Sequence, residues 1–588
     1  MATELLEQGR RDHRASPQRT IAALWRTALA REYGVAAYLV EEPGGWREVS
    51  WAEAGRRVDE LANGLLALGI RKGDAVAILG STRIEWALAD FALALVGAIV
   101  APIYANSSPK DCGYILEHSE AVAILLEDDS QQAKIDEVRR ATPRLRHVIS
   151  FADLNDLAET GCAYAAENPE ALDKAIAAID PEDIFTYIYT SGTTGPPKGC
   201  MIRHRNYYEM ANSVNRLSDL TRQGDVMLLY LPLAHNFGRL MHLLGPHIGF
   251  TIAFLSDPLR AGEALPAVRP TVFPSVPRVY EKVYAAVRGQ FEAATGVKRR
   301  LIDRALAVGY RASAIRQERR ELPRGLAVQL RLADRVVFSK VKGRLGGRLR
   351  VGISGGAPLA KEIAEFFHAL DILVLEGYGL TECTTACTVN RMTSYKFGTV
   401  GPSLPGFELK TAEDGEVLIR SETIFAGYLK DEAATQQVLT DGGWLRSGDL
   451  GEIDADGFLK INDRKKDIIV TAGGKNVAPQ NLENALKSAP LVSQALVVGD
   501  RRPYIVALIT LDGAATSPKP AEAEREMQGI VDRVNENLSR FEQIKRFAIL
   551  PRDFTAEEGE VTPTLKLKRR VCEEHFADEI EALYARSD

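Results

Sequence analysis

The chain has 588 residues, more than one hydrophobic core usually organises, so its length predicts at least two domains or several lobes. A hydrophobic content of 46% and a charged content of 26% are typical of soluble globular proteins. The net charge of −6 argues against a dedicated nucleic-acid binder. The six cysteines are scattered and form no CxxC pair. This pattern argues against a disulfide framework or a zinc site and favours a reducing cytosol.

The N-terminal segment MATELLEQGRRDHR is charged and lacks the apolar stretch of a secretory signal. The longest apolar run extends from Phe91 to Tyr104 and contains Pro102. It is shorter than the roughly 20 residues that a membrane-spanning helix needs. We therefore expect a buried helix that continues into a strand, and we expect a cytoplasmic protein.

Helical and apolar patterns alternate along the first part of the chain. Residues 51–70 predict a helix with Val58, Leu61, Leu65 and Leu68 on one face. Short apolar runs predict buried strands, and the alternation predicts an α/β fold with mostly parallel sheets. The predicted strands lie at 74–79, 98–104, 121–127, 226–234, 251–255, 271–276, 349–356 and 372–379.

The pattern changes twice further along the chain. Residues 281–350 are helical in pattern and carry 18 Lys and Arg against 6 Asp and Glu, a net of +12, so the rest of the chain sums to −18. After Lys466 the pattern is that of a small α+β unit, and we place a domain boundary near 464–466. Within that unit, residues 513–524 are typical of a surface linker, and 525–541 predict a helix.

A strand that ends at Thr190 runs directly into a loop of hydroxyls and glycines that contains one lysine, Lys198. Glycine lets the backbone approach an anion closely, and N–H groups, hydroxyls and an ammonium supply donors. This chemistry predicts a phosphate-binding loop, with a flexible surface loop as the alternative. It is not a Walker A loop, because no GxxxxGK[ST] occurs here. The predicted contacts are Thr190, Ser191, Gly192, Thr193, Thr194, Gly195 and Lys198.

The whole string from Tyr187 to Gly199 closely resembles the signature loop of the adenylate-forming superfamily, and further motifs follow in that family's order as far as Arg570. This superfamily includes acyl-CoA synthetases, luciferase-like enzymes and peptide-synthetase adenylation domains. The resemblance implies a large multi-lobed N-terminal domain, residues 1–465, and a small mobile α+β C-terminal domain, residues 466–588. It also implies ATP, Mg²⁺ and CoA as cofactors.

Two later motifs resemble the adenine pocket of that superfamily. By resemblance, Tyr378 stacks on adenine, Thr381 reaches the α-phosphate, and Glu382 binds Mg²⁺ with help from Thr190. The chemistry agrees, because an aromatic face suits a base and a hard carboxylate suits Mg²⁺. The implied nucleotide contacts are Gly355, Gly356, Ala357, Glu376, Gly377, Tyr378, Gly379 and Thr381.

The next motifs resemble those for the ribose and for domain movement. Asp449 is similar to the carboxylate that accepts both ribose hydroxyls, a task suited to its several lone pairs. By resemblance, Arg464 contacts the ribose and Lys466 is the hinge between the domains. The alternative for 464–467 is a solvated charge cluster.

The segment 562–570 resembles the one that carries the catalytic lysine of adenylation. Such a lysine stabilises the charge that develops around the reacting phosphorus. Lys566 aligns best. Lys568 remains an alternative, because relatives often have glycine directly before this lysine and this chain has Leu565.

Residues 274–282 and the helical insertion after them resemble the long-chain acyl-CoA synthetase branch. By resemblance, His235 and Phe237 lie beside the substrate carboxylate and the mouth of the acyl tunnel, although a lone histidine is often structural. Some relatives carry a gating tryptophan where this chain has Arg239, which puts that gate in doubt.

Gly473, Gly474 and Lys475 resemble the loop beside the pantetheine tunnel of CoA-using relatives. The sequence therefore predicts a long-chain fatty acyl-CoA synthetase that takes a fatty acid, ATP and CoA. One alternative is a fatty acyl-AMP ligase that loads a carrier protein, although the insertion typical of those enzymes is not evident. A second is a non-catalytic regulator that binds acyl groups or nucleotides. A monomer and a homodimer both remain open.

The basic segment 281–350 predicts contact with an anionic membrane surface, because long-chain acids partition into bilayers and Lys and Arg attract anionic lipids. In the alternative interpretation, the arginines cover apolar surface with their stems and pair with carboxylates of the same chain.

Overall fold

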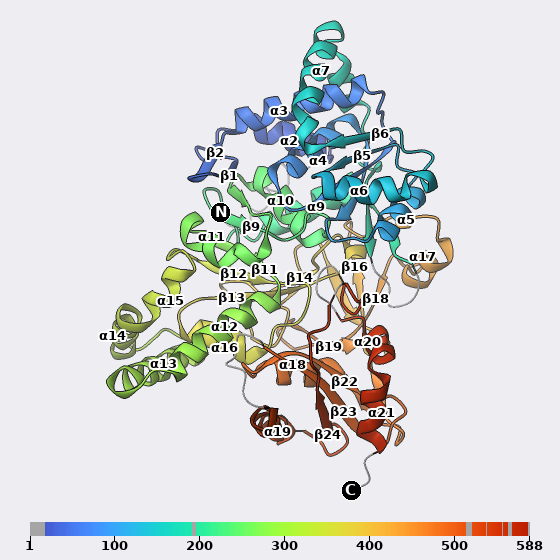
Figure 1. The fold of residues 1–588 in the computed structure, drawn as a ribbon. Helices are drawn as coiled ribbons and strands as arrows, with labels where there is room; N and C mark the ends of the chain where they lie inside the picture. Colours follow the sequence, from blue (N-terminus) through green and yellow to red (C-terminus); the bar gives the residue numbers. More distant parts are fainter. Residues whose placement is uncertain are drawn as a thin grey trace.

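The computed structural model describes residues 18–190, 196–512, 520–536, 538–555, 557–562 and 567–585, so the charged N-terminal segment lies outside the description. The described residues form sheets of seven, eight, four, two and three strands. The three-stranded sheet lies at the lower end of the molecule in Figure 1, below the larger sheets. The predicted α/β fold with mostly parallel large sheets is confirmed.

Five neighbouring strands of the seven-stranded sheet run parallel, and two antiparallel strands extend one edge. The predicted helix-to-strand run is confirmed: helix α4 ends at Val96, Gly97 closes it with a φ of 78°, and buried strand β4 follows. The strands are β3 Ala75–Gly80, β4 Ile99–Tyr104, β5 Ala123–Leu126, β6 His147–Ser150, β7 Ile184–Thr190, β8 Lys198–Arg203 and β17 Gly427–Tyr428.

The eight-stranded sheet has a parallel centre and an antiparallel strand at each edge, β2 and β14. Its central strands are shorter than the apolar runs that predicted them, because the ends of those runs form the loops that carry site residues. The strands are β1 Tyr38–Glu42, β2 Gly45–Val49, β9 Val226–Leu229, β10 Thr251–Phe254, β11 Val272–Ser275, β12 Val351–Ser354, β13 Val374–Tyr378 and β14 Thr388–Val389.

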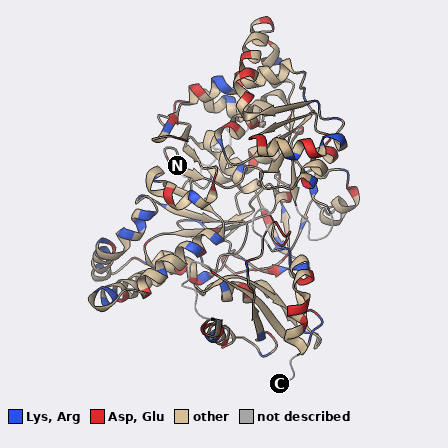
Figure 2. Ribbon diagram, in the orientation of Figure 1, with Lys and Arg blue, Asp and Glu red and all other residues tan. Residues whose placement is uncertain are grey.

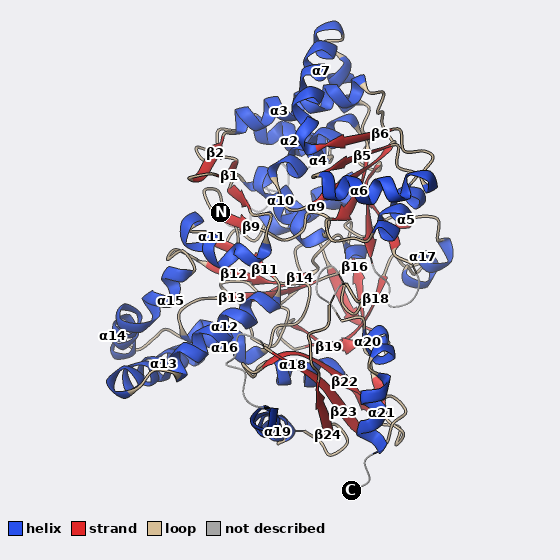
Figure 3. Cartoon of the chain, viewed as in Figure 1, coloured by secondary structure: helices blue, strands red, loops and turns tan. Residues whose placement is uncertain are grey.

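Helices cover the two large sheets (Figure 3). The helix predicted at 51–70 forms over Trp51–Ala67, with Ser50 as its N-cap and Val58, Leu61 and Leu65 buried. Leu68, predicted on the same face, is its half-buried C-cap. The α-helices are α2 Ile21–Leu29, α3 Trp51–Ala67, α4 Ile84–Val96, α5 Pro109–Ser119, α6 Asp129–Val138, α7 Leu154–Glu167, α8 Ala171–Ala177, α9 His204–Asn215, α10 Asn236–Ile248, α11 Ala261–Val268, α16 Lys361–Ala369 and α17 Glu432–Val438. The 3₁₀ turns are η1 Arg139–Ala141, η2 Phe151–Asp153, η3 Pro258–Arg260 and η5 Thr381–Cys383.

The basic insertion is helical, as its pattern predicts. Its residues 296–344 extend to the left of the molecule in Figure 1. Helix α13 packs against α14 and α16. The elements are α12 Pro277–Glu292, α13 Gly296–Gln317, α14 Arg324–Ala333, the π-helical turn η4 Asp334–Phe338 and α15 Ser339–Arg344.

A four-stranded antiparallel sheet precedes the C-terminal unit, and residues 465–467 form the turn that leaves it. Its strands are β15 Glu408–Thr411, β16 Glu416–Arg420, β18 Leu445–Ile453 and β19 Leu459–Arg464. The C-terminal unit contains β20 Ile469–Val470, β21 Asn476–Val477, β22 Val492–Val498, β23 Ile505–Leu511, β24 Ile544–Ile549, α18 Pro479–Lys487, α19 Pro520–Asn535, α20 Arg569–His575 and α21 Ala577–Ala585.

Both ends of one helix in this unit differ from the prediction. Residues 520–524, predicted as linker, belong to α19, and the rest of the predicted linker, 513–519, lies outside the described residues. The helix also ends six residues earlier than predicted. Its last residue, Asn535, exchanges two 2.9 Å hydrogen bonds with the backbone of Ile544 at the start of β24, which fixes the chain reversal.

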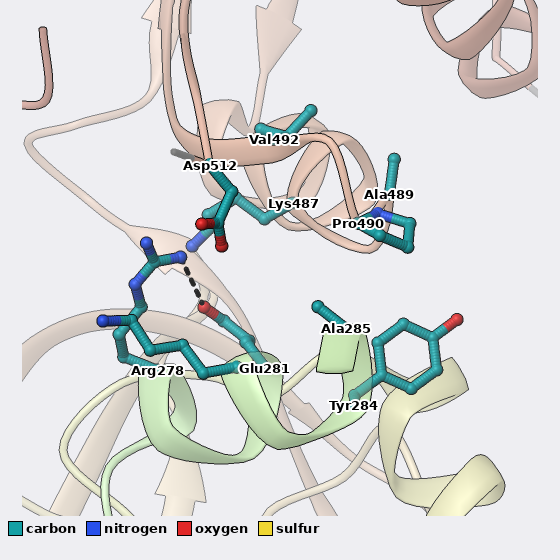
Figure 4. Close-up of a pocket in the computed structure, with 10 residues that line it drawn as sticks. Arg278, Glu281, Tyr284, Ala285, Lys487, Ala489, Pro490, Val492 and Asp512 are labelled. Carbon is teal, nitrogen blue, oxygen red and sulfur yellow. Dashed lines mark ion pairs between the residues drawn. The ribbon is translucent and has the colours of Figure 1, made fainter. Parts of the chain in front are cut away.

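Helix α12 contacts the C-terminal unit through Arg278, which lies just before the basic insertion. Its guanidinium donates two 2.6 Å hydrogen bonds to Ser493, one to the carbonyl oxygen and one to Oγ. Figure 4 shows the narrow crevice at this seam, where Arg278 also pairs with Glu281. Its volume of about 10 Å³ is too small for a substrate, so the seam is a contact between the two parts of the chain.

Candidate active site

The predicted phosphate-binding loop lies between two paired strands, β7 and β8. Thr190 ends β7 and lies opposite Lys198 at the start of β8. Ser191, Gly192, Thr193, Thr194 and Gly195 lie outside the described residues. The Lys198 ammonium lies 3.2 Å from the Asp431 carboxylate and 5.1 Å from the centre of the Tyr428 ring. A partly exposed cation therefore stands where the predicted loop returns to the sheet.

Glu382, the predicted Mg²⁺ ligand, lies on η5 and is close to Lys198. Edge strand β17 pairs with β8 and carries Tyr428, whose hydroxyl donates a 2.7 Å hydrogen bond to Glu382 Oε1. Burial and the Glu382 carboxylate raise the pKa of Tyr428, so its phenol remains a neutral donor. Tyr428 thus links Lys198 to Glu382. Tyr428 was not among the residues predicted for the site.

The predicted adenine and ribose residues meet where the end of β13 approaches the middle of β18 and the end of β19. The Tyr378 hydroxyl donates a 2.5 Å hydrogen bond to Asp449 Oδ2, and Arg464 Nε lies 3.2 Å from Asp449 Oδ1. Asp449 itself is only 3% exposed. Burial opposes the charge on Arg464, but the Asp449 carboxylate raises the pKa of Arg464 above its usual value. The Asp449 carboxylate is therefore held in position by Tyr378 and Arg464.

Glycines let two backbone segments approach each other beside Tyr378. A Cβ on Gly379 would lie 2.0 Å from the carbonyl oxygen of Thr385, so no other residue fits there. A Cβ on Gly377 would lie 3.1 Å from the carbonyl oxygen of Thr388, which is tight. The Thr381 carbonyl accepts a 3.3 Å hydrogen bond from Asn236 Nδ2. These contacts hold the 377–381 segment in a single shape.

Gly355, Gly356 and Ala357 follow β12 and make a turn, in which Gly356 has a φ of 86° and open space beside its Cα. Glu376 on the neighbouring strand is buried and accepts a 2.9 Å hydrogen bond from the Leu359 amide. Burial raises the pKa of Glu376 to about 8. Its carboxyl is therefore mostly protonated at neutral pH and supports the turn rather than binding a cation.

The predicted acyl-pocket residues begin helix α10. His235 is the N-cap, and its Nδ1 accepts a 3.1 Å hydrogen bond from the Phe237 amide. The Phe237 ring is the nearest neighbour of Gly355, 3.3 Å from where a Cβ would stand. The acyl motif and the adenine turn are therefore in contact. The capping bond gives His235 a structural role in this arrangement.

Arg239 is buried in the core and is not exposed, as a residue that gates a tunnel would be. Its guanidinium is fully buried and forms an ion pair with Asp90, with Nε 3.0 Å from Oδ2, and it donates a 2.6 Å hydrogen bond to Thr186 Oγ1. The ring of Phe185 lies 4.4 Å away. Arg239 therefore joins α10 to α4 inside the core.

The residues predicted for CoA lie elsewhere. Gly473, Gly474 and Lys475 form a turn between β20 and β21, where Gly474 has a φ of 70°. Gly473 and Lys475 line a cavity of about 610 Å³ whose other walls are all C-terminal: Thr471, Pro503, Tyr504, Arg540, Phe541, Lys545 and Arg546. None of the described nucleotide-site residues lines it.

Of the predicted hinge lysine and the predicted catalytic lysine, only the hinge lysine lies among the described residues. Lys466 lies in the exposed turn between the four-stranded sheet and the C-terminal unit. Lys566 lies outside the described residues. Its alternative, Lys568, is the N-cap of α20, and its amide donates a 2.7 Å hydrogen bond to the Glu560 carbonyl.

Comparison with known proteins identifies the family. The family profile described as "AMP-binding enzyme" matches residues 25–429, more than half of the chain. The chain belongs to the AMP-binding enzyme family. The profile for the C-terminal domain of AMP-binding enzymes matches residues 466–588.

Relatives of this AMP-binding enzyme match over nearly its full length. It is 40% identical over 566 residues to the long-chain-fatty-acid–CoA ligase FadD15 of Mycobacterium bovis. The aligned region covers 92% of this chain and 93% of that protein. It is 30% identical to the long-chain-fatty-acid–CoA ligase ACSBG2 of Xenopus laevis, over 97% of this chain and 84% of that protein. Among solved structures, the adenylation domain of a carboxylate reductase from Mycobacterium chelonae has a TM-score of 0.77 at 25% identity, covering 97% and 92%.

Proposed function

We propose that this AMP-binding enzyme is a long-chain fatty acyl-CoA synthetase. In the first half-reaction, a carboxylate oxygen of the fatty acid attacks the α-phosphorus of ATP, and pyrophosphate leaves. In the second, the thiol sulfur of CoA attacks the acyl carbonyl, AMP leaves, and the thiol proton passes to solvent. The observation that carries the proposal is the convergence of two groups, Lys198–Tyr428–Glu382 and Tyr378–Asp449–Arg464, from three different sheets.

These side chains divide the work of binding ATP. Asp449 keeps acceptor positions for the ribose hydroxyls, and the Tyr378 ring offers a face for adenine. Lys198, together with the loop that it closes, attracts the phosphates. A cation directed at the α-phosphate from 562–570 stabilises the developing charge, and we assign this role to Lys566.

Mg²⁺ fits this site as a shared ligand of protein and substrate. Tyr428 occupies one oxygen of Glu382, which leaves the other for a cation. No group of three or more His, Cys, Asp or Glu side chains suited to a metal occurs among the described residues. Mg²⁺ commonly takes one or two protein oxygens and completes its shell with water and phosphate oxygens. Glu382 and the Thr190 hydroxyl are the residues that we expect to hold it.

The C-terminal cavity favours CoA as the thiol that accepts the acyl group. The cavity beside Gly473 and Lys475 has the size of a ligand pocket, and it combines cations with the exposed Phe541 and the half-buried Tyr504. Phosphates and an adenine ring require that combination. We therefore propose that residues 466–588 move about Lys466 to bring this cavity to the acyl-adenylate. A fatty acyl-AMP ligase would use a carrier protein in place of CoA.

The support for a long-chain acid is the identity to long-chain-fatty-acid–CoA ligases over most of both chains. The test is a panel of acids from C4 to C20 in which pyrophosphate release and thioester formation are measured separately, with CoA and with a holo-carrier protein. We expect both products with long-chain acids and CoA. ADP as a product, or thioester only on the carrier, would contradict the proposal.

A cavity variant sharpens this test. Arg540→Ala removes one cavity cation and should raise the KM for CoA about tenfold, because charge-assisted phosphate contacts are among the strong hydrogen bonds. Pyrophosphate release should not change. Lys460→Ala, which removes an exposed cation paired with Glu452 on β18, is the matched control.

A further inference from the structure

The basic arm, defined as residues 296–344 of α13, α14, η4 and α15, carries an unusual charge. It contains 14 Lys and Arg against 4 Asp and Glu, a net of +10 in a chain whose total is −6. Figure 2 shows blue segments gathered on these helices at the left of the molecule, with few red ones among them. Like charges repel, so this concentration is unfavourable unless water or a partner compensates it.

Pairing inside the protein accounts for only part of this charge. Arg299, Arg316, Arg320 and Lys342 form ion pairs, and Arg319 donates a hydrogen bond to Ser394. Nine further cations are exposed and form no ion pair with any residue that the structure describes. These are Lys298, Arg300, Arg304, Arg311, Arg324, Arg331, Arg335, Lys340 and Arg344.

Large apolar side chains are exposed on the same arm. Six of the ten large hydrophobic residues that are exposed in the described chain belong to it, although it is a small part of the sequence. Val328, Leu332 and Val336 are 53%, 58% and 49% exposed and recur every four residues, so they form a stripe along one face of α14 and η4. Val297 and Leu301 make the same spacing at the start of α13.

This stripe is separate from the core face of the helix. Leu326, Leu330 and Ala333 of α14 are buried and supply its packing against the protein. The outward stripe is therefore not needed to hold the arm in place. It is flanked by the unpaired Arg331 and Arg335, so apolar and cationic side chains alternate on one outer surface.

We propose that the basic arm docks on the surface of an anionic lipid bilayer. Its cations attract anionic headgroups, and the apolar stripe enters the interface between headgroups and acyl chains. A nucleic acid or an acidic protein would use the cations but gain little from the stripe, so a lipid surface matches both observations. No helix of the described chain is long and apolar enough to cross a bilayer, which makes this contact peripheral. The inference goes beyond the proposed function and does not depend on it.

The first test measures cosedimentation with phosphatidylglycerol vesicles across a salt series, with phosphatidylcholine vesicles for comparison. We expect binding to phosphatidylglycerol alone, fading as salt rises. Each cation near such a surface contributes roughly fivefold to partitioning, so the triple variant Arg324→Glu, Arg331→Glu, Arg335→Glu should bind at least about a hundredfold more weakly. No binding of the unaltered chain at low salt overturns the proposal.

Matched variants separate the arm from net charge. The control Arg56→Glu, Arg140→Glu, Arg146→Glu changes total charge equally at exposed arginines for which the described structure has no ion pair. It should lose less than about threefold, because its charges lie outside the arm. An equal loss in control and arm variants overturns the proposal, since it would indicate a general charge effect. An unchanged thermal unfolding midpoint shows that each variant is folded.

The second test addresses the stripe. The variant Val328→Gln, Leu332→Gln, Val336→Gln keeps every cation, so binding to heparin, a water-soluble polyanion, should not change. Vesicle binding should weaken about tenfold or more, and the remainder should be more sensitive to salt. Equal vesicle binding with and without the stripe would show that the arm binds any polyanion, and would overturn docking on lipid.

Discussion

The fixed carboxylate of Asp449 offers a quantitative test of ribose recognition. A carboxylate provides about four acceptor positions. The Tyr378 hydroxyl takes one at 2.5 Å and Arg464 takes another at 3.2 Å, so two remain, one for each ribose hydroxyl. A hydrogen bond to a charged acceptor contributes about 1.5–3 kcal/mol, and each 1.36 kcal/mol changes a rate tenfold. Removing one hydroxyl should therefore lower kcat/KM roughly 10- to 150-fold.

The assay is a cycle of two enzymes and two nucleotides. Pyrophosphate release is measured for the unaltered enzyme and for Asp449→Ala, each with ATP and with 2′-deoxy-ATP. The unaltered enzyme should prefer ATP by the factor above. The variant should be much slower with ATP yet distinguish the two nucleotides by less than about threefold, because the acceptor of the hydroxyl is gone.

A matched control is Glu452→Gln, which removes an exposed carboxylate from the same strand, β18, and should keep the full preference for ATP. If Asp449→Ala still discriminates against 2′-deoxy-ATP by tenfold or more, another residue contacts the hydroxyl and the reasoning is wrong. A loss of activity together with loss of thermal stability would instead show that the Asp449–Arg464 pair holds the fold.

Four further outcomes are expected. Lys566→Ala should slow adenylation by roughly 10² or more while sparing thioester formation from preformed acyl-adenylate. Lys466→Pro should impair thioester formation more than adenylation, because proline fixes φ at the hinge. Arg278→Ala should change the ratio of adenylation to thioester formation about threefold to tenfold, because it removes two hydrogen bonds that hold the C-terminal unit in the described orientation. Burial raises the pKa of the Glu376 carboxyl to about 8. The contribution of this carboxyl to the unfolding free energy of the unaltered enzyme is therefore largest below about pH 4.5 and falls by about 1.4 kcal/mol per pH unit up to about pH 8. Glu376→Gln should remove this pH dependence.

Each outcome has a measurement that can contradict it. The half-reactions are read by pyrophosphate release and by thioester formation. The lysine assignment is wrong if Lys568→Ala, and not Lys566→Ala, loses adenylation. Equal losses in both half-reactions for a folded hinge variant would argue against the hinge. For Glu376, thermal unfolding of the unaltered enzyme and the Gln variant is compared from pH 5 to 9, and parallel curves would show that the carboxyl is already ionised.

The sequence predicted what depends on local pattern. The apolar runs gave the strands, since a buried parallel strand needs apolar residues on both faces, and the glycine-rich motifs marked where the backbone must turn tightly. Long-range contacts were not predictable in this way. Tyr428 joins Lys198 to Glu382 only because β17 pairs with β8, which lies more than 220 residues earlier in the chain. No local pattern around Tyr428 indicates that pairing.

The charge of the basic segment was predictable, but the use of its residues was not. A count of Lys and Arg cannot tell a paired arginine from an unpaired one. The structure separates Arg316, which pairs with Asp371, from Arg331, which pairs with no described residue. It likewise shows that Arg278 contacts Ser493, a residue 215 positions away. Such distinctions require three-dimensional distances.

The buried pair of Asp90 and Arg239 has a consequence for how this protein can be altered. Replacing either residue alone leaves a charge unpaired in the core, which costs roughly 3–5 kcal/mol, much of the stability of a typical domain. Replacing both with apolar residues of similar volume can be neutral. A mutational library that varies α10 to reshape the acyl pocket, but holds position 90 constant, would therefore discard most substitutions at 239 for reasons unrelated to substrate. Varying the two positions together would open that part of sequence space, and related sequences are expected to change them as a pair.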